Sequence, residues 1–219
     1  MCLSRIVDAV EDAGIQESTT LIVVSDHGFT TTPKAIRPNV VLRQAGLLTV
    51  EANKLSTAQV HVIPEGGIGL VYCTNPGEAA ENATKFREMF VGQEGVADVL
   101  LPDRFEEVGL QHPRDYRQSP DAILVAADGY SVAGTVEGET LVTTSTEAKT
   151  SLGSHGFIST LPKMKALCVL SGAGIRSGSH LPTVENIDIT PTIAELLNLE
   201  YPHSDGKPLV SALIKTSER

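Results

Sequence analysis

The chain has 219 residues, of which 41% are hydrophobic and 20% charged, and its formal net charge at pH 7 is −10. This composition is typical of a globular protein with one good-sized domain or two small ones, and it excludes the disordered and fibrous classes. The acidic balance argues against binding along a nucleic-acid backbone, which requires clustered Lys and Arg. It is compatible with a small anionic substrate, because metal ions can supply positive charge locally.

The cysteines and the apolar runs exclude two further classes. Cys2, Cys73 and Cys168 lie far apart, so they predict neither a disulfide framework nor a thiolate metal site. No apolar stretch approaches the ~20 residues of a membrane-spanning helix. The first residues predict a charged helix rather than a signal peptide. The sequence gives no indication of the cellular compartment.

The N-terminal region predicts a helix followed by a strand. Leu3, Ile6, Val7 and Val10 recur at helical spacing, and Gly14 is the expected end of that helix. The apolar run 21–24 then predicts a strand buried on both faces of a mostly parallel sheet. It ends in Ser-Asp-His-Gly at 25–28, and catalytic groups of open α/β sheets collect beyond such strand ends.

The middle of the chain, residues 31–149, predicts a small α/β subdomain inserted as a cap. A Pro-Glu-Gly-Gly turn at 64–67 joins two expected strands, which is the pattern of a hairpin. The expected helices are 40–48 and 78–90, and the expected strands are 60–63, 69–73, 97–101 and 121–127.

The C-terminal region predicts the rest of the core. A polar segment leads to Gly-Ser-His-Gly-Phe at 153–157, and a strand is expected over 166–170. Thr190 and Pro191 predict the start of a helix whose apolar stripe is Ile193, Leu196 and Leu197.

Asp26 and His27 are residue types that bind zinc, and they stand together at a strand end. Adjacent strand residues point to opposite faces, so both reach one ion only if the chain turns there, and Gly28 permits a turn. From the residues alone, a buried aspartate beside a surface histidine explains the pair equally well. His155 sits among glycines in a polar loop, where a solvated side chain and a metal ligand both remain open.

The two histidine motifs together resemble the second half of the type I phosphodiesterase/nucleotide pyrophosphatase family of the alkaline phosphatase superfamily. The resemblance continues through Lys-Met-Lys-Ala-Leu at 163–167, Ser-Gly-Ala-Gly-Ile-Arg at 171–176, the segment 184–193, Leu-Leu at 196–197 and the end of the chain at 202–209. It implies an alkaline-phosphatase-like, mostly parallel sheet that is incomplete here. Residues 1–30 and 150–219 would form the core, and residues 31–149 the inserted cap.

The resemblance also implies the chemistry. In this family two metal ions, commonly zinc, flank a threonine or serine nucleophile and drive hydrolysis of a phosphodiester or pyrophosphate. Asp26 and His27 would bind one ion and His155 the other. The implied partner is a small phosphorylated substrate; a nucleotide, a lipid head group and a phosphonate all remain open, as does a phosphomonoesterase or mutase relative.

One part of the family pattern is absent from this sequence. The family places an aspartate, the nucleophile and an Asp-x-x-x-His segment before the Ser-Asp-His-Gly strand. The 25 residues before Asp26 contain no Asp-x-x-x-His segment, and their only aspartates are Asp8 and Asp12 on the expected helix. We therefore expect a fragment, or a chain that requires a partner, with weak metal binding and no activity alone. Uncovered apolar surface would favour self-association.

Three alternatives remain beside this interpretation. An inactive remnant or interaction module has the same sequence features. A serine hydrolase would use Ser154 or Ser25, but neither lies in a Gly-x-Ser-x-Gly context. The Gly-Ala-Gly at 172–174 is not followed by the helix that dinucleotide binding requires. Surface or packing roles are expected for His61 and His112. His180 and His203 lie in expected loops, and an approach of His203 to the mouth of the site remains open.

Overall fold

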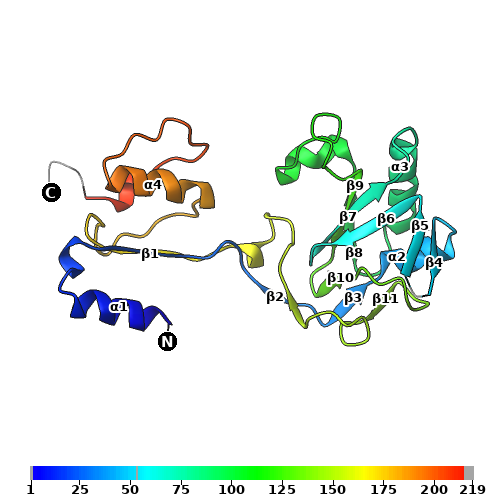
Figure 1. The fold of residues 1–219 in the computed structure, drawn as a ribbon, viewed down its shortest axis with the longest axis horizontal. Coiled ribbons are helices and arrows are strands. Elements are labelled where there is room, and N and C mark those ends of the chain that lie inside the picture. The colour runs from blue at the N-terminus through cyan, green and yellow to red at the C-terminus, as the bar shows by residue number, and fades with distance from the viewer. Residues whose placement is uncertain (1, 53, 215–219) are drawn as a thin grey trace. The chain divides into compact units, whose positions relative to one another are not determined.

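The computed structural model describes residues 2–52 and 54–214, and its chain divides into two compact units (Figure 1). Unit 1 contains the residues up to Asp26 and those from Ala166 onward, and unit 2 is His27–Lys165. Residues 215–219 of the expected core segment lie outside the described residues. The division into a catalytic core and a cap remains a prediction.

Unit 2 is built around a four-stranded antiparallel sheet with the order β6-β7-β9-β8. The strands are β6 (Val60–Pro64), β7 (Ile68–Cys73), β8 (Val96–Leu100) and β9 (Ala122–Ala126). Helix α3 (Ala79–Phe90) joins β7 to β8, and β9 lies between these two strands. This arrangement is a split β-α-β unit, in agreement with the expected strands, turn and helix of the middle region.

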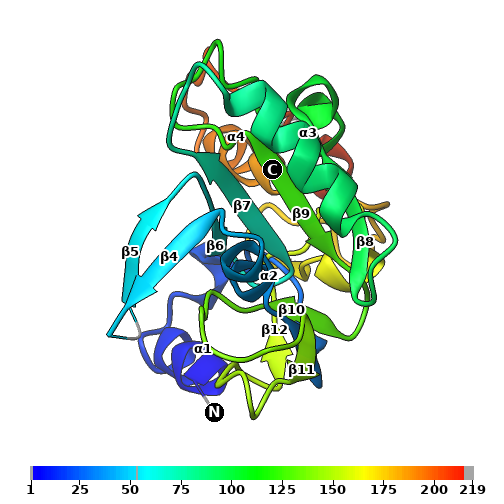
Figure 2. The ribbon, with the colours of Figure 1, turned by 90° about the vertical axis from the view of Figure 1, so that its right-hand side faces the viewer.

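The central strand β9 is apolar because it is covered on both faces. Ala122, Leu124 and Ala126 pack into the main core, to which α3 contributes Phe86 and Phe90. Figure 2 shows α3 lying across β7, β9 and β8. The alternate residues of β9 pack instead against Phe105 of the 3-10 helix η2 (Pro102–Val108), with Leu100 and Val108. Period-two alternation therefore places one strand between two hydrophobic layers.

Smaller sheets surround this layer. β4 (Leu48–Glu51) pairs with β5 (Lys54–Ala58), and β3 (Lys34–Ile36) lies between β10 (Tyr130–Val132) and β11 (Val142–Thr144). β2 (Thr30–Thr31) pairs antiparallel with β12 (Gly153–Ser154). None of these strands was expected from the sequence. All except β4 and β5 have only two or three residues, which carry too little periodicity to be recognised.

Unit 1 contains helix α1 (Cys2–Asp12), strands β1 (Thr20–Val24) and β13 (Cys168–Gly172), and helix α4 (Ile189–Leu196). Its buried residues include Ile175 and Leu213, which form a β-bridge, and Thr192. No helix among residues 2–52 and 54–214 is long and apolar enough to cross a membrane.

The α/β class is as predicted, but the strand pair of the flanking segments is antiparallel instead of parallel. β1 pairs antiparallel with β13, and within the described residues β3 and β10 form the parallel pair. An apolar run encodes burial and carries no information on strand direction, which explains the difference. The run 21–24 is also not buried on both faces, since Val24 is 43% exposed.

Two helices differ from the expectation. The helix expected over 40–48 is α2 (Pro38–Gln44), which begins with proline in its first turn, and Leu48 already belongs to β4. The expected stripe of α4 is not its buried face, because Ile193 and Leu197 are 40% and 62% exposed. Pro191, Thr192 and Ala194 are buried there instead.

Candidate functional site: a stacked histidine pair at a strand end

Backbone and side-chain hydrogen bonds hold the chain in place as it leaves β1. Ser25 donates its amide to the Leu167 carbonyl at 3.2 Å, and its Oγ accepts the Leu167 amide at 3.1 Å. The carbonyl of Asp26 accepts a hydrogen bond of 2.7 Å from Nδ2 of Asn186. All of these residues belong to unit 1, which ends at Asp26, and the Asp26 side chain is exposed. Asn186 was not singled out from the sequence, because an isolated asparagine gives no signal of its partner.

Gly28 permits a close backbone contact at the start of unit 2. Its amide donates to the Met164 carbonyl at 2.8 Å, and a Cβ at Gly28 would lie 2.0 Å from the Lys163 carbonyl oxygen. Its φ is not in the left-handed region. The glycine is therefore required for this approach rather than for the turn that the sequence suggested.

Two distant segments meet beside Gly28, and they bring the predicted histidines together. The β2–β12 ladder pairs Thr30 with Ser154, so the residues before β2 lie next to those after β12. The rings of His27 and His155 stack with centroids 4.1 Å apart and an interplanar angle of 11°. The exposed ring of Phe29 lies 6.4 Å from that of His155. Both histidines belong to unit 2, where His27 is half-buried and His155 exposed.

One hydrogen bond defines the chemistry of the His27 ring. Nδ1 of His27 lies 2.7 Å from the carbonyl oxygen of Gly28. A carbonyl only accepts, so Nδ1 carries the proton of the neutral ring and the lone pair resides on Nε2. A hydrogen bond of this kind sets the tautomer and the orientation of metal-binding histidines in proteins.

The backbone of His155 is held by the turn between β6 and β7. The amide of Gly67 donates to the His155 carbonyl at 2.9 Å. Gly66, with φ +78°, lies so close that a Cβ there would be 2.1 Å from the same carbonyl oxygen. Gly156, with φ +71°, leaves no room for a Cβ beside the Glu65 carbonyl oxygen. The turn was expected from the sequence, but its contact with His155 was not.

The residues present fit part of a metal site. Imidazole nitrogen and carboxylate oxygen are zinc ligands, and catalytic zinc sites take three protein ligands for each ion. Within residues 2–52 and 54–214, no three side chains of His, Cys, Asp and Glu are grouped so that they could hold an ion. His27 and His155 are two side chains, fewer than the three protein ligands that a catalytic zinc ion takes.

The alternative candidates lie in other environments. Ser154 Oγ donates to the His155 carbonyl and sits in a strand, which is not the strand–turn–helix geometry of a serine nucleophile. His61 is half-buried in β6, and burial lowers the pKa of its imidazole. His180 and His203 are exposed.

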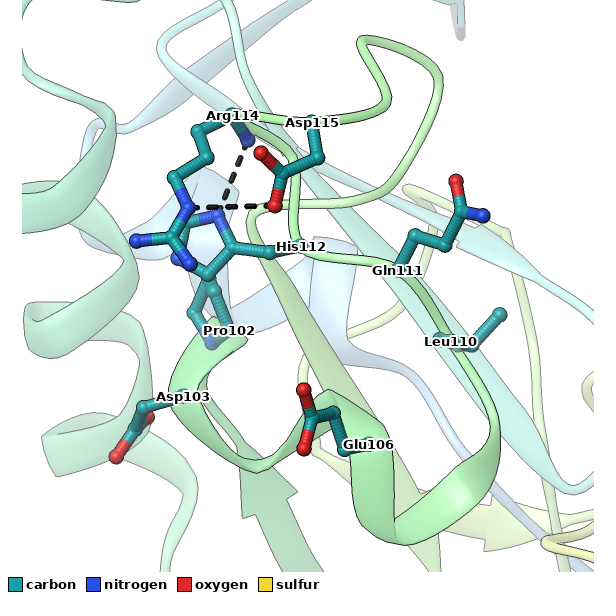
Figure 3. Close-up of a pocket in the computed structure, with 8 residues that line it drawn as sticks. All are labelled: Pro102, Asp103, Glu106, Leu110, Gln111, His112, Arg114 and Asp115. Atoms are coloured by element: carbon teal, nitrogen blue, oxygen red, sulfur yellow. Dashed lines mark hydrogen bonds and ion pairs between the residues drawn. The ribbon is translucent and has the colours of Figure 1, made fainter.

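An open hollow of about 580 Å³ lies beside η2 in unit 2, and Figure 3 shows its side chains. Nδ1 of His112 accepts the Arg114 amide at 3.0 Å, and Arg114 Nε lies 3.3 Å from a carboxylate oxygen of Asp115. Asp103 and Glu106 complete a lining of mixed charge. The three carboxylates outnumber Arg114 and all four charged groups are exposed to solvent, so the hollow gives no indication of a specific ligand.

Comparison with solved structures identifies the fold. Murine ectonucleotide pyrophosphatase/phosphodiesterase 5 matches with a TM-score of 0.67 and 16% identity, over 94% of this chain and 48% of that chain. An inactive variant of the murine protein, in complex with AMP, matches with a TM-score of 0.69 and 17% identity, over 97% of this chain and 50% of that chain. The human protein matches with a TM-score of 0.66 and 16% identity, also over 97% of this chain and 50% of that chain. The fold is thus alkaline-phosphatase-like, and the chain spans about half the length of these structures.

The family follows from the sequence itself. The family model described as type I phosphodiesterase/nucleotide pyrophosphatase matches residues 1–158, well over half of the chain. The protein therefore belongs to this family of the alkaline phosphatase superfamily. No curated protein matches the sequence significantly.

Proposed function

We propose that this chain forms part of the active site of a metal-dependent hydrolase that cleaves phosphodiester or pyrophosphate bonds. Asp26 and His27 bind one divalent ion, His155 binds a second, and zinc is the ion we expect. The observation that carries the proposal is the stacked pair of His27 and His155, which a two-residue ladder brings together from opposite ends of unit 2.

Each of these residues has a defined task. His27 presents Nε2 as a ligand, because its Nδ1 proton is held by the Gly28 carbonyl. His155 is presented by a backbone fixed at its own carbonyl. When bound, two divalent ions lower the pKa of a nucleophile or water and balance charge on phosphoryl oxygens.

The proposal includes groups outside the described residues. The remaining ligands and the nucleophile would come from there, since three ligands per ion are not assembled within residues 2–52 and 54–214. Residues 1–30 and 150–219 would belong to the catalytic core and residues 31–149 to a cap. The AMP bound by the murine relative supports a nucleotide as substrate. Self-association, or a partner chain, would cover the exposed apolar side chains of unit 1.

Zinc titration of the full chain by calorimetry tests the proposal. We expect weak binding that falls by about 10-fold or more in His27→Ala and in His155→Ala, because each variant loses a ligand. His112→Ala is the matched control, a histidine whose ring already accepts a backbone amide, and it should bind like the wild type. Equal affinity in all four proteins would contradict the proposal and favour the alternative of an inactive remnant or interaction module.

A further inference from the structure

We propose that the β6–β7 turn, Glu65-Gly66-Gly67, is the positioning element of His155 and thereby sets the metal affinity of the site. This inference rests on the proposed function, because it concerns the same histidine. It assigns a role to the contacts that three glycines make at the backbone of His155 and Gly156: Gly66, Gly67 and Gly156.

The backbone of the turn touches the peptide between His155 and Gly156 at two points. The Gly67 amide donates to the His155 carbonyl, and Gly66 lies against the same oxygen at a distance that excludes any side chain. At the other end of the same peptide, a Cβ at Gly156 would lie 1.8 Å from the Glu65 carbonyl oxygen. The peptide that follows the Cα of His155 is therefore confined by the turn, which restricts the direction of the His155 side chain.

The turn is itself fixed by the rest of unit 2. The Gly66 carbonyl accepts the Val132 amide at 2.7 Å, and the Gly67 carbonyl accepts the Ala126 amide at 2.9 Å. The buried ring of Phe157 lies on Gly67, where a Cβ would be 2.1 Å from the ring. The turn thus connects the four-stranded sheet and β10 to the histidine rigidly.

A rigid connection of this kind has a consequence for metal binding. Metal sites tolerate only small errors in ligand placement, and changes in the groups that orient a ligand typically weaken binding by about 10-fold to 100-fold. A side chain at Gly66 must push the His155 carbonyl away, and this movement turns His155 relative to His27. The sheet of unit 2 therefore controls the geometry of the pair.

The test compares two glycines with nearly the same positive φ. Gly66→Ala and Gly92→Ala both place alanine at positive φ, +78° and +83°, but a Cβ at Gly92 meets nothing within 4 Å. Both variants place a side chain at positive φ, and only Gly66→Ala disturbs His155. We expect zinc affinity to fall about 10-fold or more in Gly66→Ala and to stay within about 2-fold of wild type in Gly92→Ala.

A second comparison separates positioning from a general loss of structure. In a His155→Ala background, Gly66→Ala should have no further effect on zinc affinity, whereas a merely structural role would lower it again. If Gly66→Ala does not fold, Gly66→Asn replaces it, because asparagine tolerates positive φ and still carries the obstructing Cβ. Equal zinc affinity in wild type, Gly66→Ala and Gly92→Ala would overturn the inference alone. Absence of zinc binding in the wild type would overturn the proposed function, and the inference with it.

Discussion

Replacement of Asn39 by alanine should strongly destabilise unit 2, because Asn39 closes the edge of the four-stranded sheet. β6 is an edge strand, and edge strands expose backbone groups that need partners. The fully buried side chain of Asn39 accepts the Val62 amide at 2.9 Å and donates to the Val62 carbonyl at 2.8 Å. It also donates to the Gly134 carbonyl at 3.2 Å.

The cost follows from these buried groups. Each buried donor or acceptor left without a partner costs about 1–3 kcal/mol, so the two Val62 groups together predict a loss of about 2–6 kcal/mol in the free energy of unfolding. Urea denaturation followed by circular dichroism measures it. Asn75→Ala is the control, because the exposed Asn75 accepts one backbone hydrogen bond and should lose about 1 kcal/mol at most. A loss below about 1 kcal/mol in Asn39→Ala would refute this account of the sheet edge.

Three further predictions concern the core, the pH dependence and the surface. Phe86→Ala should cost about 3–5 kcal/mol in the same denaturation assay, because Phe86 is 1% exposed, whereas Val91→Ala, at 45% exposure, should change stability by no more than about 0.5 kcal/mol. Burial lowers the pKa of His61 in the folded protein. The unfolded chain therefore binds more protons than the folded protein, and the free energy of unfolding should fall as pH decreases from about 7.5 to about 5.5. His61→Gln should flatten this dependence, and parallel pH profiles for the two proteins would contradict the assignment. The apolar side chains of α1 are exposed, and Ile6 is 52% exposed. Light scattering should therefore detect self-association, and Ile6→Glu should reduce it. A wild-type protein that stays monomeric at high concentration would count against this prediction.

Elements with a strong pattern were predictable from the sequence. The apolar residues of α1 recur at helical spacing, and Gly14 ends that segment with φ +65°. The hairpin around residues 64–67 was indicated by its glycines. In each case local chemistry and the final fold require the same conformation.

Other elements depend on contacts that no local pattern encodes. α4 buries Thr192 rather than Ile193 because the Thr192 hydroxyl accepts the Leu209 amide at 2.9 Å and donates to the Asp188 carbonyl at 2.6 Å. A satisfied polar side chain can occupy a buried position that hydrophobic periodicity assigns to its neighbour. Strand direction was missed for a related reason, since the partner of β1 is set by the chain far downstream.

The candidate site was partly predictable. The motifs at 25–28 and 153–157 identified His27 and His155, but only the resemblance to a family linked them. Their stacking depends on the two-residue ladder of β2 and β12, which is too short to recognise in a sequence. The turn that holds the His155 backbone acts through its main chain, and main-chain hydrogen bonds leave no residue signature beyond the glycines that permit them.

Anomalous diffraction at the zinc edge, on crystals of the full chain grown with zinc, tests the central claim most directly. The proposal predicts anomalous density within about 2.0–2.2 Å of an imidazole nitrogen of His27 and of His155. Zinc bound only elsewhere in the chain, with both rings still stacked and free of metal, would contradict it.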